Sequence, residues 1–224
     1  MIHMLKISDK TAEPQAGLNV RLFKFILAVV YAVGILGMAF PASRFYFQLL
    51  TPFHLLLSTV VLLLFHKDWG PKFILFACLA FLIGFGAEVI GVQTGVLFGE
   101  YTYGTVLGPK LFGVPLLIGV NWFLLVYVTG ALVHNYIRND FFAAVLAALL
   151  MVFLDFLIEP VAISLEFWAW EAEEIPLSNY IGWFAIALLI QIIYRKIPFE
   201  KQNPIAIFML LCLAVFFSIL ALIL

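Results

Sequence analysis

Seven long apolar runs dominate the sequence and limit the folds that it can adopt. Hydrophobic residues make up 65% of the 224 residues and charged residues 11%, whereas a soluble domain is about half apolar and a quarter charged. Because the chain has too few polar residues to cover the surface of a water-soluble protein, we expect an all-α integral membrane protein, a seven-transmembrane-helix bundle. A spanning helix needs roughly 20 residues. The predicted spans are residues 22–40, 45–65, 71–93, 115–136, 140–165, 179–194 and 204–224.

Two span boundaries stay open from the sequence. The second span either begins at Thr51 and Pro52, a good pair for the cap and first position of a helix, or begins near Arg44 and kinks at Pro52. The sixth span is short and could be buried among its neighbours. All seven spans form one domain, residues 21–224. The polar residues 1–20 before it predict a disordered cytoplasmic leader.

The basic residues predict an orientation. If the N-terminus is cytoplasmic, the outer segments keep only Arg44 and Lys110 of the 12 Lys and Arg residues. Because cytoplasmic loops are enriched in Lys and Arg, we expect the N-terminus inside and the C-terminus outside, in the cytoplasmic membrane. Cys78 and Cys212 lie within apolar runs and predict no disulfide framework. The sequence leaves the oligomeric state open.

Two carboxylates interrupt the fifth apolar run. Asp155 and Glu159 are four residues apart, so a helix places them on one face. Pro160 has no N–H and leaves the carbonyl of Phe156 without its helical donor. Two like charges on one face destabilise a helix unless they share a proton, a cation or water. Ionisable side chains at such a depth are functional candidates by default.

Five polar residues from four spans are predicted to lie at one depth. At a rise of 1.5 Å per residue, Asp155 lies roughly 22 Å from the inner start of its span, in the outer half of the membrane. Similar counting places His54, Glu88, Asn121 and Glu159 near this level, which predicts a polar cup open to the outside. His54 could instead be structural, and Asn121 could only bond across helices.

Residues 95–115 are too rich in glycine for a stable helix and too apolar for a free loop. We expect a lid, or a partly re-entrant loop, over the outer mouth of the cup. The hydroxyl groups of Tyr101 and Tyr103 could reach the acids below. Anchoring of these two aromatic residues at the membrane interface is the alternative.

The sequence lacks the residues that several other functions of membrane proteins require. There is no nucleotide-binding glycine loop, and no Cys or His spacing that fits a zinc site. Retinal needs a buried lysine, but every lysine lies at a span end or in a loop. We therefore expect no metal, no organic cofactor and no nucleic-acid partner. A proton-coupled transporter is a rival function, although its relay would have to cross the inner halves of the spans, which are almost free of ionisable groups.

Several motifs in spans three to six resemble the membrane carotenoid biosynthesis family, which includes hydratases of bisanhydrobacterioruberin and of γ-carotene or lycopene ends. These motifs are Glu88-Val-Ile-Gly-Val-Gln-Thr-Gly, Phe98-Gly-Glu-Tyr-Thr-Tyr, Leu107-Gly-Pro, Gly113-Val-Pro, Asn121-Trp122, Asp155-x-x-x-Glu159-Pro160-x-Ala162, Trp168-x-Trp170 and Asn179-x-x-Gly-Trp183. The resemblance implies that water is added across the terminal double bond of an acyclic carotenoid, giving a tertiary alcohol.

The candidate residues suit this reaction. Burial and a neighbouring carboxylate both favour a protonated acid, which an alkene requires. We assign the acid to Asp155, with Glu159 or Glu88 as the base that orients water, although the order among the three stays open. Aromatic faces can stabilise the cation. The predicted substrate-binding residues are His54, Tyr101, Tyr103, Asn121, Trp122 and Trp183. The polyene would enter sideways from lipid; a carotenoid-binding subunit without catalysis is a further alternative.

Overall fold

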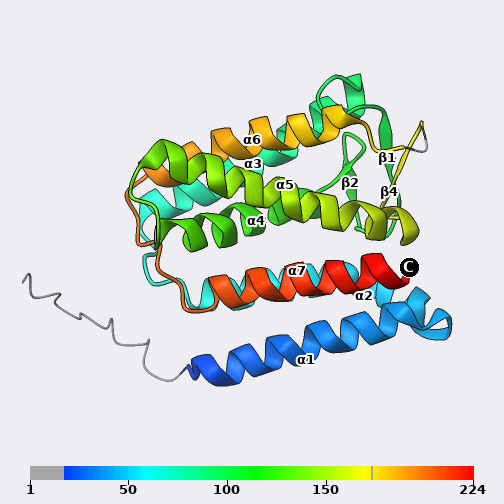
Figure 1. Cartoon of the computed structure of the whole chain (residues 1–224), viewed down its shortest axis with the longest axis horizontal. Helices are drawn as coiled ribbons and strands as arrows, with labels where there is room; N and C mark the ends of the chain where they lie inside the picture. The colour runs from blue at the N-terminus through cyan, green and yellow to red at the C-terminus, as the bar shows by residue number, and fades with distance from the viewer. Residues whose placement is uncertain (1–17, 173) are drawn as a thin grey trace, which may run out of the picture.

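The computed structural model describes residues 18–172 and 174–224. This part of the chain has seven helices that are long and apolar enough to cross a membrane (Figure 1), as the hydropathy predicts. Most of the predicted leader lies outside the described residues. The helices are α1 (Val20–Ala39), α2 (Pro41–Leu64), α3 (Pro71–Thr94), α4 (Leu117–His134), α5 (Asp140–Ser164), α6 (Leu177–Lys196) and α7 (Ala206–Ile223).

The structure settles both open boundaries. Helix α2 begins at Pro41 and contains Pro52 in its interior, so the alternative with a long helix through Pro52 is the observed one. Helix α6 has 20 residues, so the expectation of a short sixth span is wrong. It continues through Arg195 and Lys196 because their long side chains can keep their charges at the polar end of the helix.

Helix α4 is the centre of the bundle. In α4, 78% of the residues in the apolar 18-residue stretch are buried inside the protein, whereas the corresponding share is 22% in α1 and in α2. Figure 1 shows α1 and α7 on one side of α4 and α5, with α3 and α6 on the other. The outer helices present apolar side chains such as Phe25, Leu36 and Phe53, which are 58–67% exposed. Such a surface suits hydrocarbon rather than water.

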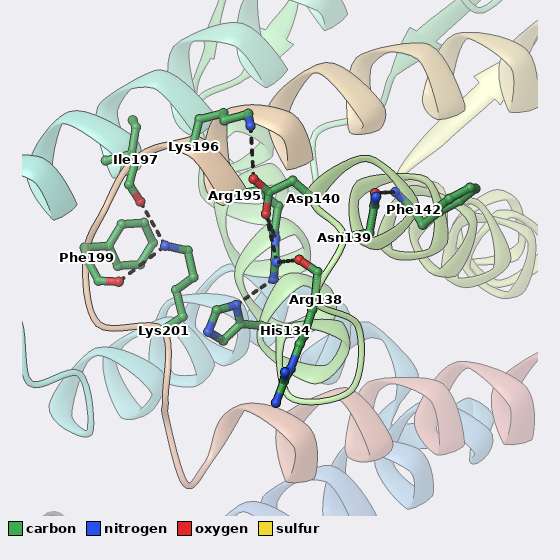
Figure 2. A network of polar contacts seen from close by, with 10 residues as sticks. All are labelled: His134, Arg138, Asn139, Asp140, Phe142, Arg195, Lys196, Ile197, Phe199 and Lys201. Carbon is green, nitrogen blue, oxygen red and sulfur yellow. Dashed lines mark hydrogen bonds and ion pairs between the residues drawn. The ribbon is translucent and has the colours of Figure 1, made fainter.

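At one end of the bundle, the basic end, the connections from α4 to α5 and from α6 to α7 meet in a polar network (Figure 2). Arg195 Nη2 lies 2.9 Å from Asp140 Oδ1 and donates to the carbonyl of Arg138. Lys196 Nζ lies 3.0 Å from Asp140 Oδ2, and Arg195 also contacts His134. The network joins α4, α5 and α6. The predicted orientation would place this end in the cytoplasm.

The opposite end, the strand end, is covered by four short strands: β1 (Tyr101–Tyr103), β2 (Lys110–Leu111), β3 (Val114–Pro115) and β4 (Trp168–Trp170). Strand β1 pairs antiparallel with β4, which follows α5. Tyr101 lies opposite Trp170, and Tyr103 opposite Trp168. Side chains alternate along a strand, so both tyrosines are buried while Thr102 is exposed. The segment predicted as a lid thus contains a β-ribbon that turns two tyrosines inward.

Candidate active site

Four helices bring polar side chains together near the strand end. Glu88 lies in the last two turns of α3, and Glu159 lies in the last two turns of α5. Asn121 lies near the start of α4, and Asn179 lies near the start of α6. Because α3 and α5 run toward the strand end while α4 and α6 run away from it, these positions meet at a common level. The β-ribbon lies above them.

Glu88 is held by three hydrogen-bond donors. The hydroxyl groups of Tyr101 and Tyr103 donate to its Oε2 over 2.5 and 2.7 Å, and Trp122 Nε1 donates to Oε1 over 3.0 Å. The side chain is only 3% exposed. The prediction that the two tyrosines reach the acids is confirmed for Glu88. A carboxylate can accept all three bonds, so this surrounding suits an ionised group.

The two tyrosines stay protonated because the pKa of each is raised well above its usual value of 10.0. Burial is the largest cause, and the negative charge of Glu88 adds to it. A phenolate beside a buried carboxylate would be costly. Tyr101 and Tyr103 therefore remain hydrogen-bond donors to Glu88 over the whole working range of pH.

Glu159 has a similar set of three donors. Trp168 Nε1 and Trp170 Nε1, from β4, donate to its Oε2 over 3.0 and 2.9 Å. Asn179 Nδ2 donates to Oε1 over 3.2 Å. The same nitrogen also donates to Asp155 Oδ2 over 2.8 Å. One amide group thus connects the two carboxyl groups of α5.

Asp155 is in a different situation from the two glutamates. It is 0% exposed, and its Oδ1 has no hydrogen-bond partner among the described residues. Its Oδ2 accepts the bond from Asn179. Asp155 also lines neither of the two cavities described below. The residue predicted to be the acid therefore lies behind Glu159, at one remove from the open space.

A small cavity, the polar chamber, lies between the acids and the β-ribbon. Its volume is about 30 Å³, which is room for about two water molecules. Carboxylate, hydroxyl, amide and indole groups surround it, so water inside would find several partners. It is lined by Glu88, Tyr101, Tyr103, Ile118, Asn121, Ile158, Glu159, Trp168, Trp170, Asn179 and Trp183.

A larger cavity, the apolar cavity, adjoins the polar chamber. Its volume is about 80 Å³, and most of its lining residues are apolar. It is lined by Tyr31, Met38, Thr51, His54, Leu55, Ser58, Leu107, Leu117, Ile118, Asn121, Ile158, Val161, Leu165, Phe167, Trp168, Leu213, Phe216 and Phe217. Ile118, Asn121, Ile158 and Trp168 line both spaces. Water and a hydrocarbon chain can therefore meet at this boundary.

The other predicted residues divide between the two spaces. His54 lines the apolar cavity, where its Nε2 is buried without a partner among the described residues. Asn121 lies at the boundary of the two cavities. Trp183 lines the polar chamber, and Trp122 stacks on it with ring centroids 4.3 Å apart. Trp122 is fully buried, so it contacts Trp183 and Glu88 rather than the open space.

Sequence reasoning placed Asn179, Trp168 and Trp170 in motifs that resemble the family but gave none of them an individual role. For Trp168 and Trp170 a further signal was their alternation in a strand-like segment, because a period of two places both indoles on one face. Asn179 near a helix start reads as an ordinary capping residue. Its partners Asp155 and Glu159 are 24 and 20 positions away, so its role depends on the packing of α6 against α5. In the described part of the chain, no group of three or more His, Cys, Asp and Glu residues could hold a metal ion.

Comparison with known proteins identifies the family. Residues 50–224 match the carotenoid biosynthesis protein family. The chain belongs to this family. All residues of the polar chamber fall inside the matched range, and membership places the chain in carotenoid biosynthesis. The resemblance inferred from the sequence is thereby confirmed.

One relative has a more specific name. A protein of Haloarcula japonica named bisanhydrobacterioruberin hydratase is 37% identical over 110 residues. The alignment covers 46% of this chain and 38% of the relative, so it spans well under half of that protein. No solved structure matches the chain.

Proposed function

We propose that this protein adds water across the terminal double bond of an acyclic carotenoid end, such as that of lycopene, γ-carotene or bisanhydrobacterioruberin, and forms a tertiary alcohol. The observation that carries the proposal is the direct contact between a carboxylate-lined chamber for about two waters and an apolar cavity. Hydration requires these two environments side by side. The name of the relative supports the same reaction.

The reaction needs an acid, a cation-stabilising face and a base. A carboxyl group of the Asp155–Glu159 pair gives its proton to the less substituted carbon of the alkene. The tertiary cation then faces Trp183, whose ring lines the polar chamber and offers up to about 2 kcal/mol of cation–π stabilisation. A water in the chamber adds to the cation and gives a proton to Glu88, which three donors hold ready as a carboxylate.

The protons balance over a full cycle. One proton leaves the Asp155–Glu159 pair and another reaches Glu88, so the enzyme must return a proton from Glu88 to the pair. Glu88 and Glu159 line the same chamber, and water there can carry the proton across. None of these steps requires a metal or an organic cofactor. The polyene is proposed to enter from lipid into the apolar cavity, in the orientation with the strand end outside.

The test is expression of the chain in cells that make lycopene or γ-carotene, followed by mass analysis of the pigments. We expect a product heavier by one water, and we expect Glu88→Gln and Glu159→Gln to lower its formation at least tenfold. Glu171→Gln is the matched control, since Glu171 is exposed and is not one of the residues that line the chamber. Carotenoid that binds and returns unchanged would instead indicate a binding subunit. Proton flux in proteoliposomes without any pigment conversion would indicate a transporter.

A further inference from the structure

The three buried acids differ in the number of donors that they receive. Glu88 and Glu159 each accept three hydrogen bonds from side chains, on both oxygens. Asp155 accepts one, and its Oδ1 is buried without a partner among the described residues. Donors aimed at a carboxylate favour its charged form. A buried charged oxygen without a donor is costly.

The three acids also lie close together in a poorly solvated space. Asp155 and Glu159 bond to the same nitrogen of Asn179, and Glu88 lines the same chamber as Glu159. Like charges at such short range cannot all be ionised without a large cost. Hydrogen-bond donors favour the charged form of a carboxyl group, so the protonated acid is expected to be the one with the fewest donors, which is Asp155.

We propose that Asp155 and Glu159 share one proton, which rests on Asp155, and that Asn179 is the positioning residue that holds the two carboxyl groups as a unit. This inference rests on the proposed function for its catalytic meaning, but the protonation state itself does not. Asp155 stores the proton out of reach of the substrate. Glu159, which faces the polar chamber, presents it to the alkene. Asn179 also lines the polar chamber, but its role in this scheme is toward the acids: its amide fixes the spacing of the pair.

Infrared spectroscopy of the purified protein tests the protonation state without any substrate. A protonated carboxyl has a C=O stretching band that moves in heavy water. We expect one such band in the wild-type protein, its loss in Asp155→Asn, and a shift in Asn179→Leu, because that variant removes the donor to Asp155 Oδ2. Asn179→Ser is a milder second variant, since a single O–H cannot bridge two carboxyl groups.

Gln191→Leu is the matched control. Gln191 is a buried amide on the same helix, 0% exposed, and it donates to Val126 and Thr129 away from the chamber. The Gln191→Leu variant should leave the infrared band unmoved. Any loss of stability that it causes shows how much stability is lost when a buried amide is removed from α6. A band that shifts as much in Gln191→Leu as in Asn179→Leu would overturn the positioning role.

Turnover gives the second readout. We expect Asn179→Leu and Asn179→Ser to lower kcat about 10- to 100-fold with KM changed less than about threefold, since the amide acts on the acid pair rather than on substrate binding. If the wild-type protein shows no protonated-carboxyl band that disappears in Asp155→Asn, the shared proton is refuted, whatever the activity of the protein. A wild-type protein with the expected band but no hydration would leave the pair standing and refute the proposed function.

Discussion

The contact between Gly84 and Trp122 offers a sharp test of how the site is held. A Cβ at Gly84 would lie 2.3 Å from Trp122 Cγ and 2.4 Å from its Cβ, whereas ordinary contact begins at 3.4 Å. These atoms are next to the backbone of α4, so the indole cannot simply rotate away. Gly84→Ala must therefore push α3 and Trp122 apart by about 1 Å, an overpacking that costs about 1–3 kcal/mol.

A shift of Trp122 would directly affect Glu88. Trp122 Nε1 donates to Glu88 Oε1 over 3.0 Å, and loss of a hydrogen bond to a charged group costs about 1.5–3 kcal/mol. At about 1.4 kcal/mol for each factor of ten, we expect kcat to fall about 10- to 100-fold. Melting temperature in detergent should fall as well. The near-ultraviolet circular dichroism should change, because the Trp122–Trp183 stack is disturbed.

Gly86→Ala is the control on the same helix. A Cβ there would have no atom within 4 Å, and alanine favours a helix over glycine by about 1 kcal/mol. We expect this variant to keep wild-type turnover and an equal or higher melting temperature. If Gly84→Ala behaved like Gly86→Ala in all three measurements, the close seating of Trp122 against α3 would be wrong, and with it the account of how Glu88 is held.

Three further predictions concern single side chains. Tyr103→Phe removes one of the three donors to Glu88 and should lower kcat about tenfold, measured as product formed per enzyme. Trp183→Leu should lower kcat up to about 30-fold, because about 2 kcal/mol of cation stabilisation is lost. The backbone N–H of Glu200, and then that of Gly70, lower the pKa of Asp68 below its usual 3.8. The ionised Asp68 therefore stabilises the fold above about pH 4, and this stabilisation is lost as the pH falls further. Asp68→Asn should lower the melting temperature at neutral pH but not near pH 3.

Each of these has a result that would contradict it. Full turnover in Tyr103→Phe would mean that the remaining donors suffice for Glu88. Trp183→Phe keeps an aromatic face, so a loss as large as in Trp183→Leu would argue against a cation–π role. A melting temperature of Asp68→Asn that ran parallel to the wild type at every pH would show that the ionised Asp68 contributes nothing through its link to Glu200.

The sequence by itself determined the spans and the pairing of acids within one helix. Runs of apolar residues are a local property, so the seven helices could be predicted to within a few residues at most ends. The spacing of Asp155 and Glu159 places them on one face of any helix, and counting residues brought Glu88 and Asn121 near them. The family motifs also indicated carotenoid biosynthesis.

Only the tertiary structure decided which acid faces the open space and what holds each of them. Asn179 meets Asp155 and Glu159 because α6 packs on α5, and Trp168 and Trp170 reach Glu159 because β4 pairs with β1, more than 60 residues earlier. Hydropathy and periodicity describe one segment at a time, whereas these contacts depend on how distant segments pack. The same local sequence would be compatible with Asp155 facing the chamber; the rotation and packing of α5 place Glu159 there instead.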